Sequence, residues 1–156
     1  MKTIKLNLSE DEKLQLRKNG VNISSLREFA ADEIAVLLNT GVQRAQEVYA
    51  LIAFQSIPSV GPKFARDLIT MGYYTLDDLV DKDPPALLDE LERKQGFRTD
   101  PCVEDQFWLV VDYARNGNTN ENWWDFTDAR KAYRVKNGYP ADRPVIGWTE
   151  LAAITV

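Results

Sequence analysis

The sequence predicts an all-α protein built on a duplicated helical unit. Three observations favour this class. Apolar residues recur at helical spacing in several segments, helix-capping residues precede those segments, and no segment alternates apolar and polar residues over the length of a strand. The 156 residues are 44% apolar, which is enough to build a hydrophobic core. We expect helices joined by short turns, without a sheet.

Capping signals divide the first 71 residues into short helices. Ser9 and Glu12 have the spacing of a capping box, and Asn19-Gly20 is a typical end for the helix that follows. Ser25 and Asp32 are expected to cap two further helices. Beyond these, helices are predicted over about 42–54 and 63–71, on either side of a break at Pro58, Gly61 and Pro62.

The second half is predicted to hold further helices and a C-terminal extension. Asp83-Pro84-Pro85 begins a helix that continues through Leu91, and residues 101–115 form the most apolar helix. Residues 116–122 are a polar loop without periodicity, and a short basic helix follows around 127–136. We therefore expect one domain over 1–115, with 116–156 packed on it as an extension.

The composition excludes several kinds of chemistry. The chain has no histidine, which excludes histidine-based acid–base catalysis and histidine metal ligands. The single cysteine, Cys102, cannot form an intramolecular disulfide or a CxxC pair, which suits a reducing compartment. We expect a cytoplasmic protein without a cofactor, a metal or a membrane segment, and not an enzyme. The net charge of −5 argues against a generally basic nucleic-acid binder.

An internal repeat connects two of the predicted helix starts. Gly41, Ala45 and Val48 have the same mutual spacing as Gly61, Ala65 and Leu68, at an offset of 20 residues. A second set of matching spacings occurs at an offset of 51 or 52 residues. Agreement of several spacings favours duplication of a unit that consists of a helix, a glycine stop, a cap and a second helix.

Residues 57–68, IPSVGPKFARDL, resemble the helix-hairpin-helix signature. Gly61 is expected to permit a hairpin too tight for a side chain, and Pro62 presets the first turn of the second helix. Backbone amides at that helix start can hold an anion such as a DNA phosphate, with Lys63 and Arg66 beside them. The predicted phosphate site therefore consists of Gly61, Lys63 and Arg66.

A longer resemblance covers about Phe54 to Arg115. The segments IPSVGPKFARDL, MGYYTLDDLVDKDPPALLDEL, DPCVEDQFWLVVDYA and WWDF follow one another as in the pathogenicity locus family of small bacterial helix-hairpin-helix proteins. This resemblance implies a tandem helix-hairpin-helix fold and a nucleic-acid role. In nucleic-acid-binding relatives the hairpin carbonyls hold a monovalent cation, which implies the carbonyls of Gln55, Ile57 and Val60 here. The chain departs from the pattern at Ser59, which occupies a usual glycine position.

Two functions remain open from the sequence. The first is DNA binding without sequence preference through the hairpin. The alternative is a protein–protein interaction or scaffold module in which the hairpins only pack. A possible secondary surface consists of Trp123, Trp124, Arg130, Lys131 and Arg134. For the two tryptophans, packing into the core is the favoured interpretation. The basic residues are expected on a solvated helix face, with an acidic partner or the acidic stretch 77–92 as the alternatives.

Overall fold

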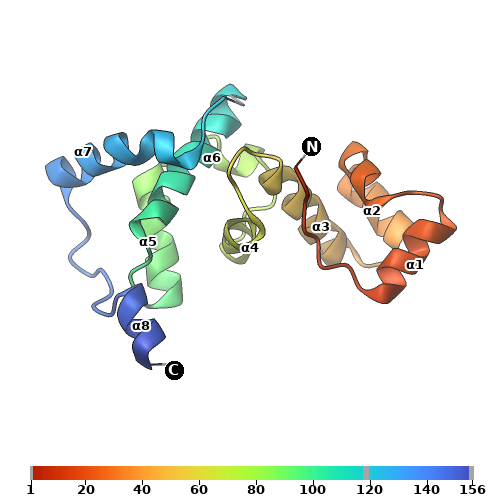
Figure 1. Cartoon of the computed structure of the whole chain (residues 1–156), viewed down its shortest axis with the longest axis horizontal. Helices are drawn as coiled ribbons and strands as arrows, with labels where there is room; N and C mark the ends of the chain where they lie inside the picture. Colours follow the sequence, from red (N-terminus) through yellow and green to blue (C-terminus); the bar gives the residue numbers. More distant parts are fainter. Residues whose placement is uncertain (1, 118–119, 155–156) are drawn as a thin grey trace. The chain divides into compact units, whose positions relative to one another are not determined.

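The computed structural model describes residues 2–117 and 120–154, and every regular element within them is a helix (Figure 1). The all-α prediction is therefore confirmed. The α-helices are α1 Glu10–Lys18, α2 Ala31–Leu38, α3 Val42–Gln55, α4 Pro62–Thr70, α5 Pro84–Gln95, α6 Pro101–Asn116, α7 Thr127–Asn137 and α8 Trp148–Ile154. Short 3-10 helices span Ile23–Glu28, Asp77–Leu79 and Trp123–Phe126. Within the described ranges, no helix is both long enough and apolar enough to cross a bilayer.

The chain divides into two compact units, an N-terminal unit over Met1–Leu76 and a C-terminal unit over Asp77–Val156. The sequence predicts a domain over 1–115 with 116–156 as an extension packed on it. Instead, α5 and α6 share a unit with the segment after 116, because α6 packs against α5, the 3-10 helix Trp123–Phe126 and α7. The polar loop at 116–122 lies partly outside the described residues.

Local capping explains where the first helices begin. Ser9 and Glu12 form the predicted capping box: the Glu12 amide donates to Ser9 Oγ at 3.1 Å, and the Ser9 amide donates to Glu12 Oε1 at 2.8 Å. The expected cap at Asp32 is wrong. Asp32 lies inside helix α2, which begins at Ala31 with Ala30 as its N-cap residue. The amide of Ala30 donates to Glu33 Oε1 at 2.9 Å.

Helix α3 forms the centre of the N-terminal unit. Its residues Ala45, Val48, Leu51 and Phe54 are fully buried, and α2 and α4 both pack against it. This burial removes apolar surface from water on more than one side of α3, so its sequence is apolar around more of its circumference than that of an ordinary surface helix.

Helix α6 has the corresponding role in the C-terminal unit. Phe107, Leu109 and Val110 are fully buried, and the side chains of Asp83 and Asp100 cap α5 and α6. The chain after α7 returns to α5, where Arg143 donates to Glu92 at 2.8 Å.

Candidate nucleic-acid interface

Six residues, 56–61, connect α3 to α4, and we call them the 56–61 turn. Ile57 and Val60 are fully buried within it, and the Val60 amide donates to the Ile57 carbonyl at 3.2 Å. Ala65 and Leu68 of α4 are fully buried as well. The apolar side chains of the sequence motif therefore fix the turn to the core.

The strained position of the turn is Ser59, and not Gly61. Ser59 has φ +60°, in the left-handed region that favours glycine. Gly61 has φ −97° and ψ −178°, an extended conformation open to any residue, and a Cβ built there would meet no atom within 4 Å. The expectation that Gly61 is needed for tightness is therefore wrong. The glycine leaves open space at the start of α4.

The turn between α2 and α3 repeats this backbone pattern. Asn39 has φ +51° two residues before Gly41, just as Ser59 precedes Gly61, and Gly41 is extended at φ −73° and ψ 167°. Each glycine is the N-cap residue of the next helix and has no side-chain capping bond. The 20-residue offset found in the sequence thus corresponds to equivalent backbone conformations.

Lys63 and Arg66 both project from the first two turns of α4 into solvent. The Lys63 side chain is 86% exposed and pairs with Asp67 at 3.2 Å, an arrangement that contributes little in water. Arg66 is exposed, and among the described residues no carboxylate pairs with it. The two predicted cations are therefore close along one helix and accessible to an anion.

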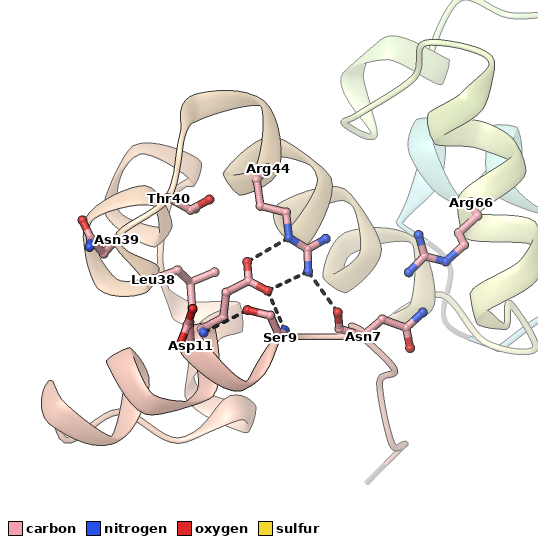
Figure 2. A pocket seen from close by; sticks show the side chains of 9 residues that line it. Asn7, Ser9, Asp11, Leu38, Asn39, Thr40, Arg44 and Arg66 are labelled. Carbon is pink, nitrogen blue, oxygen red and sulfur yellow. Dashed lines mark hydrogen bonds and ion pairs between the residues drawn. The ribbon is translucent and has the colours of Figure 1, made fainter.

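An open hollow of about 690 Å³ lies beside Arg66 in the same unit. Figure 2 shows Arg66 reaching from α4 toward Asn7 and Arg44, which line the hollow with Ser9 and Thr40. No local pattern in the sequence predicts this hollow, because its lining comes from four separate segments of the chain.

Arg44 is held in place on the wall of that hollow. Its Nε donates to Glu12 Oε2 at 2.9 Å, and its terminal nitrogen donates to Glu12 Oε1 at 3.0 Å and to the Asn7 carbonyl at 3.1 Å. These hydrogen bonds raise the pKa of Arg44 and lower the pKa of Glu12 from its ordinary value of 4.5. Arg44 therefore fixes α3 to α1, and Arg66 is the cation left available.

The predicted cation-binding carbonyls are approached by a side chain of the protein. Lys2 Nζ donates to the Ile57 carbonyl at 2.9 Å and also to the Val60 carbonyl. Desolvation lowers the pKa of the Lys2 ammonium from its ordinary value, while hydrogen bonds to the two carbonyls favour its charged form. Of the three predicted carbonyls, Lys2 contacts those of Ile57 and Val60. The hydrogen bonds that join Gln55 to the backbone of Lys5 are made by the Gln55 side chain. No local pattern in the sequence predicts the Lys2 contact, because it joins residues 55 and 58 positions apart.

The predicted secondary surface is largely occupied by the C-terminal unit itself. Arg130 pairs with buried Asp105 at 2.8 Å, and Arg134 pairs with Glu104 at 2.9 Å and with Asp89 at 3.1 Å. The side chains of the two arginines are only 10% and 7% exposed. Neither guanidinium is therefore available to a partner, and Arg134 binds the acidic stretch of its own chain.

The remaining residues of that surface differ in exposure. Lys131 is exposed. Trp123 and Trp124 meet edge to face with ring centroids 5.4 Å apart; Trp123 is partly buried and Trp124 is 54% exposed. Trp124 and Lys131 of the predicted surface therefore remain accessible, whereas its two arginines do not.

Charge is unevenly divided between the two units. The N-terminal unit has nine Lys and Arg against eight Asp and Glu, a net charge of +1. The C-terminal unit has ten against sixteen, a net charge of −6. The acidity of the whole chain therefore does not belong to the unit that contains the 56–61 turn.

Comparison with known proteins gives one family. A family model described as pathogenicity locus, Cdd1, matches residues 46–132, which is more than half of the chain. The matched range begins in α3 and ends in α7. The comparisons with curated proteins and with solved structures gave no match.

Proposed function

The chain belongs to the pathogenicity locus (Cdd1) family, and we propose that it is a helix-hairpin-helix protein that binds DNA without sequence preference through the start of α4. Gly61, Lys63 and Arg66 form the phosphate contact. The observation that carries the proposal is Arg66, an exposed arginine without a carboxylate partner among the described residues, one turn from the exposed Lys63.

The physical basis is the positive end of a helix with two cations beside it. Backbone N–H groups at a helix N-terminus attract anions, and α4 has no side-chain cap that would compete at Gly61. Arginine is well suited to phosphate because its planar guanidinium can donate two parallel hydrogen bonds. None of these groups reads a base edge, so the binding has no sequence preference.

The second turn of the same kind has a supporting role in this proposal. Its backbone at Asn39 and Gly41 resembles the 56–61 turn, but Arg44 beside it is already paired with Glu12. The turn between α2 and α3 therefore stabilises the unit, and the 56–61 turn contacts phosphate.

Fluorescence anisotropy at low salt tests the proposal with labelled single-stranded and double-stranded oligonucleotides. The double variant Lys63→Glu plus Arg66→Glu should bind much more weakly. Arg17→Glu plus Lys18→Glu is the matched control, because it makes the same change in net charge at exposed positions of α1. Equal loss in both variants would mean that only net charge matters, and no binding by the wild type would refute the proposal.

Gly61→Ala is a subtler test of the same contact. Its Cβ meets no atom of the protein, so stability should change by less than about 1 kcal/mol. The methyl group would stand where a phosphate approaches the backbone, so oligonucleotide affinity should fall. Unchanged affinity would place the phosphate elsewhere.

A protein–protein interaction module is the second candidate, and the C-terminal unit favours it. That unit has a net charge of −6 and exposes Trp124 and Val135, at 54% and 89%. Exposed apolar residues in an acidic setting suit a protein partner better than a phosphate backbone. Absence of oligonucleotide binding even at low salt would favour this candidate.

We also propose that the protein is cytoplasmic and not an enzyme. Desolvation and the nearby Asp100 raise the pKa of Cys102, which disfavours the reactive thiolate at neutral pH. Among the described residues, no three Cys, Asp or Glu side chains cluster in a way that could hold a metal ion. Slow reaction of Cys102 with a thiol reagent at neutral pH would agree with this proposal, and rapid reaction would contradict it.

A further inference from the structure

A cleft of about 410 Å³ lies in the N-terminal unit, between the segment before α1 and the 3-10 helix Ile23–Glu28. Four apolar side chains line it, those of Ile4, Leu6, Ile23 and Ile52. Its volume falls within the range of small-ligand sites, about 300–1,000 Å³. Ile23 is 45% exposed, so a ligand that covers it would remove apolar surface from water.

Both sides of the cleft are held by hydrogen bonds within the protein. On one side, the Lys5 amide donates to Gln55 Oε1 at 3.0 Å, and Gln55 Nε2 donates to the Lys5 carbonyl at 2.8 Å. On the other, Asn22 Oδ1 accepts from the Ser25 amide at 2.9 Å and from the hydroxyls of Ser24 and Ser25 at 2.7 and 2.8 Å. The cleft is therefore formed before any ligand arrives, which keeps the entropic cost of binding low.

A second hollow of about 140 Å³ continues the cleft along α3. It shares Arg27 and Ile52 with the cleft, and its lining includes Tyr49, Ala53 and Ser56 of α3. These positions are three or four residues apart, so they lie on one face of the helix. We call the cleft and this hollow together the α3 groove, and an elongated ligand can lie along it.

The charged side chains that line the α3 groove are both cations, Lys2 and Arg27. The Lys2 ammonium is already bonded to the 56–61 turn. Arg27 is exposed, and no carboxylate of the described residues pairs with it. A guanidinium can donate two parallel hydrogen bonds to a carboxylate. The groove is therefore complementary to a molecule that has an apolar body and a carboxylate.

We propose that the α3 groove binds a small carboxylate with an apolar chain. The chain covers Ile23 and Ile52, and Arg27 holds the carboxylate. Lys63 and Arg66, which form the proposed phosphate contact, line neither part of the groove. The ligand site is thus additional to the proposed function and does not depend on it.

The test is a titration of the isotope-labelled protein with decanoate, followed by amide chemical shifts below the concentration at which micelles form. Decanoate should shift the amides of residues 4–6, 23–27 and 49–56 saturably. Decyltrimethylammonium has the same chain with a positive head group. It should bind at least about tenfold more weakly, because it cannot pair with Arg27.

Arg27→Gln tests the carboxylate contact. The variant removes a charge at an exposed position, so the fold should be retained while decanoate affinity falls about tenfold. Arg17→Gln is the matched control, because Arg17 is exposed on α1 and does not line the groove. It should bind decanoate as tightly as wild type does.

Ile23→Ser tests the apolar wall and should weaken the binding of decanoate as well. Three results would overturn the proposal: no saturable shift with decanoate, equal affinity for the two amphiphiles, or equal decanoate affinity in Arg27→Gln and wild type. None of these measurements uses an oligonucleotide. The ligand site can therefore fail while DNA binding stands, and the reverse.

Discussion

At the scale of single residues, the 56–61 turn contains a serine, Ser59, in a backbone conformation that favours glycine. A non-glycine residue at φ +60° costs free energy, since its Cβ approaches the following carbonyl. The sequence correctly directs attention to 57–68, because glycine and proline punctuate an apolar pattern there. It does not reveal which residue is left-handed, because this depends on the path of the backbone between two packed helices.

Replacing Ser59 by glycine should therefore stabilise the protein. The free energy of unfolding should rise by about 1 kcal/mol, because glycine tolerates the left-handed region. Urea unfolding measures the change. Ser56→Gly is the control: Ser56 is right-handed at φ −74° and donates to the Ile52 carbonyl, so the same replacement there should destabilise. A lower free energy of unfolding in Ser59→Gly would contradict backbone strain at Ser59.

At the scale of elements, ion pairs connect helices that are distant in the sequence: Glu12 and Arg44 join α1 to α3, and the acidic residues of α6 pair with arginines of α7. Capping signals in the sequence located α1 and α5 well, because a capping bond involves residues within three positions of one another. The pairs between elements could not be predicted in the same way. Glu104 and Asp105 lie on a helix whose sequence is mainly apolar, so nothing local indicates that α7 will supply their arginines.

The pair of Glu12 and Arg44 should make stability depend on pH. Arg44 lowers the pKa of Glu12 below 4.5, so the folded state binds this proton less readily than the unfolded state. The stabilisation is fully present above pH 4.5 and is lost as the pH falls through the folded pKa. Glutamine keeps the capping geometry but not the charge, so Glu12→Gln should cost about 2 kcal/mol at neutral pH.

Urea unfolding of wild type and Glu12→Gln across the acid range measures this loss. The two stabilities should converge as the pH falls below 4.5. A gap that stays constant with pH would mean that the Glu12 charge contributes nothing to the contact between α1 and α3.

Removing Arg134 should strongly destabilise the C-terminal unit. Burial already raises the pKa of Glu104, and Arg134 opposes this effect. Arg134→Met leaves Glu104 buried without its charged partner, which should cost about 3–5 kcal/mol. Lys131→Met, at an exposed position on the same helix, should change stability by less than about 0.5 kcal/mol. Similar effects in the two variants, measured by urea unfolding, would contradict the structural role of Arg134.

At the scale of the whole molecule, the net charge of −5 hides an uneven distribution. The N-terminal unit is close to neutral, at +1, and the C-terminal unit has all of the excess acid. The net charge of the whole chain therefore does not describe the field around α4, and the binding of a charged partner depends on that local field. The sequence shows where charges lie along the chain, but the division at residue 76 was needed to assign them to units.

The central claim is that phosphate binds at the start of α4, and a salt titration of oligonucleotide affinity tests it most directly. For wild type, the logarithm of the association constant for duplex DNA should fall linearly with the logarithm of salt concentration. In Lys63→Glu plus Arg66→Glu the slope should be shallower by about two, because each lost phosphate contact removes about one released counterion. An unchanged slope, or the same decrease in Arg17→Glu plus Lys18→Glu, would contradict phosphate binding at this helix.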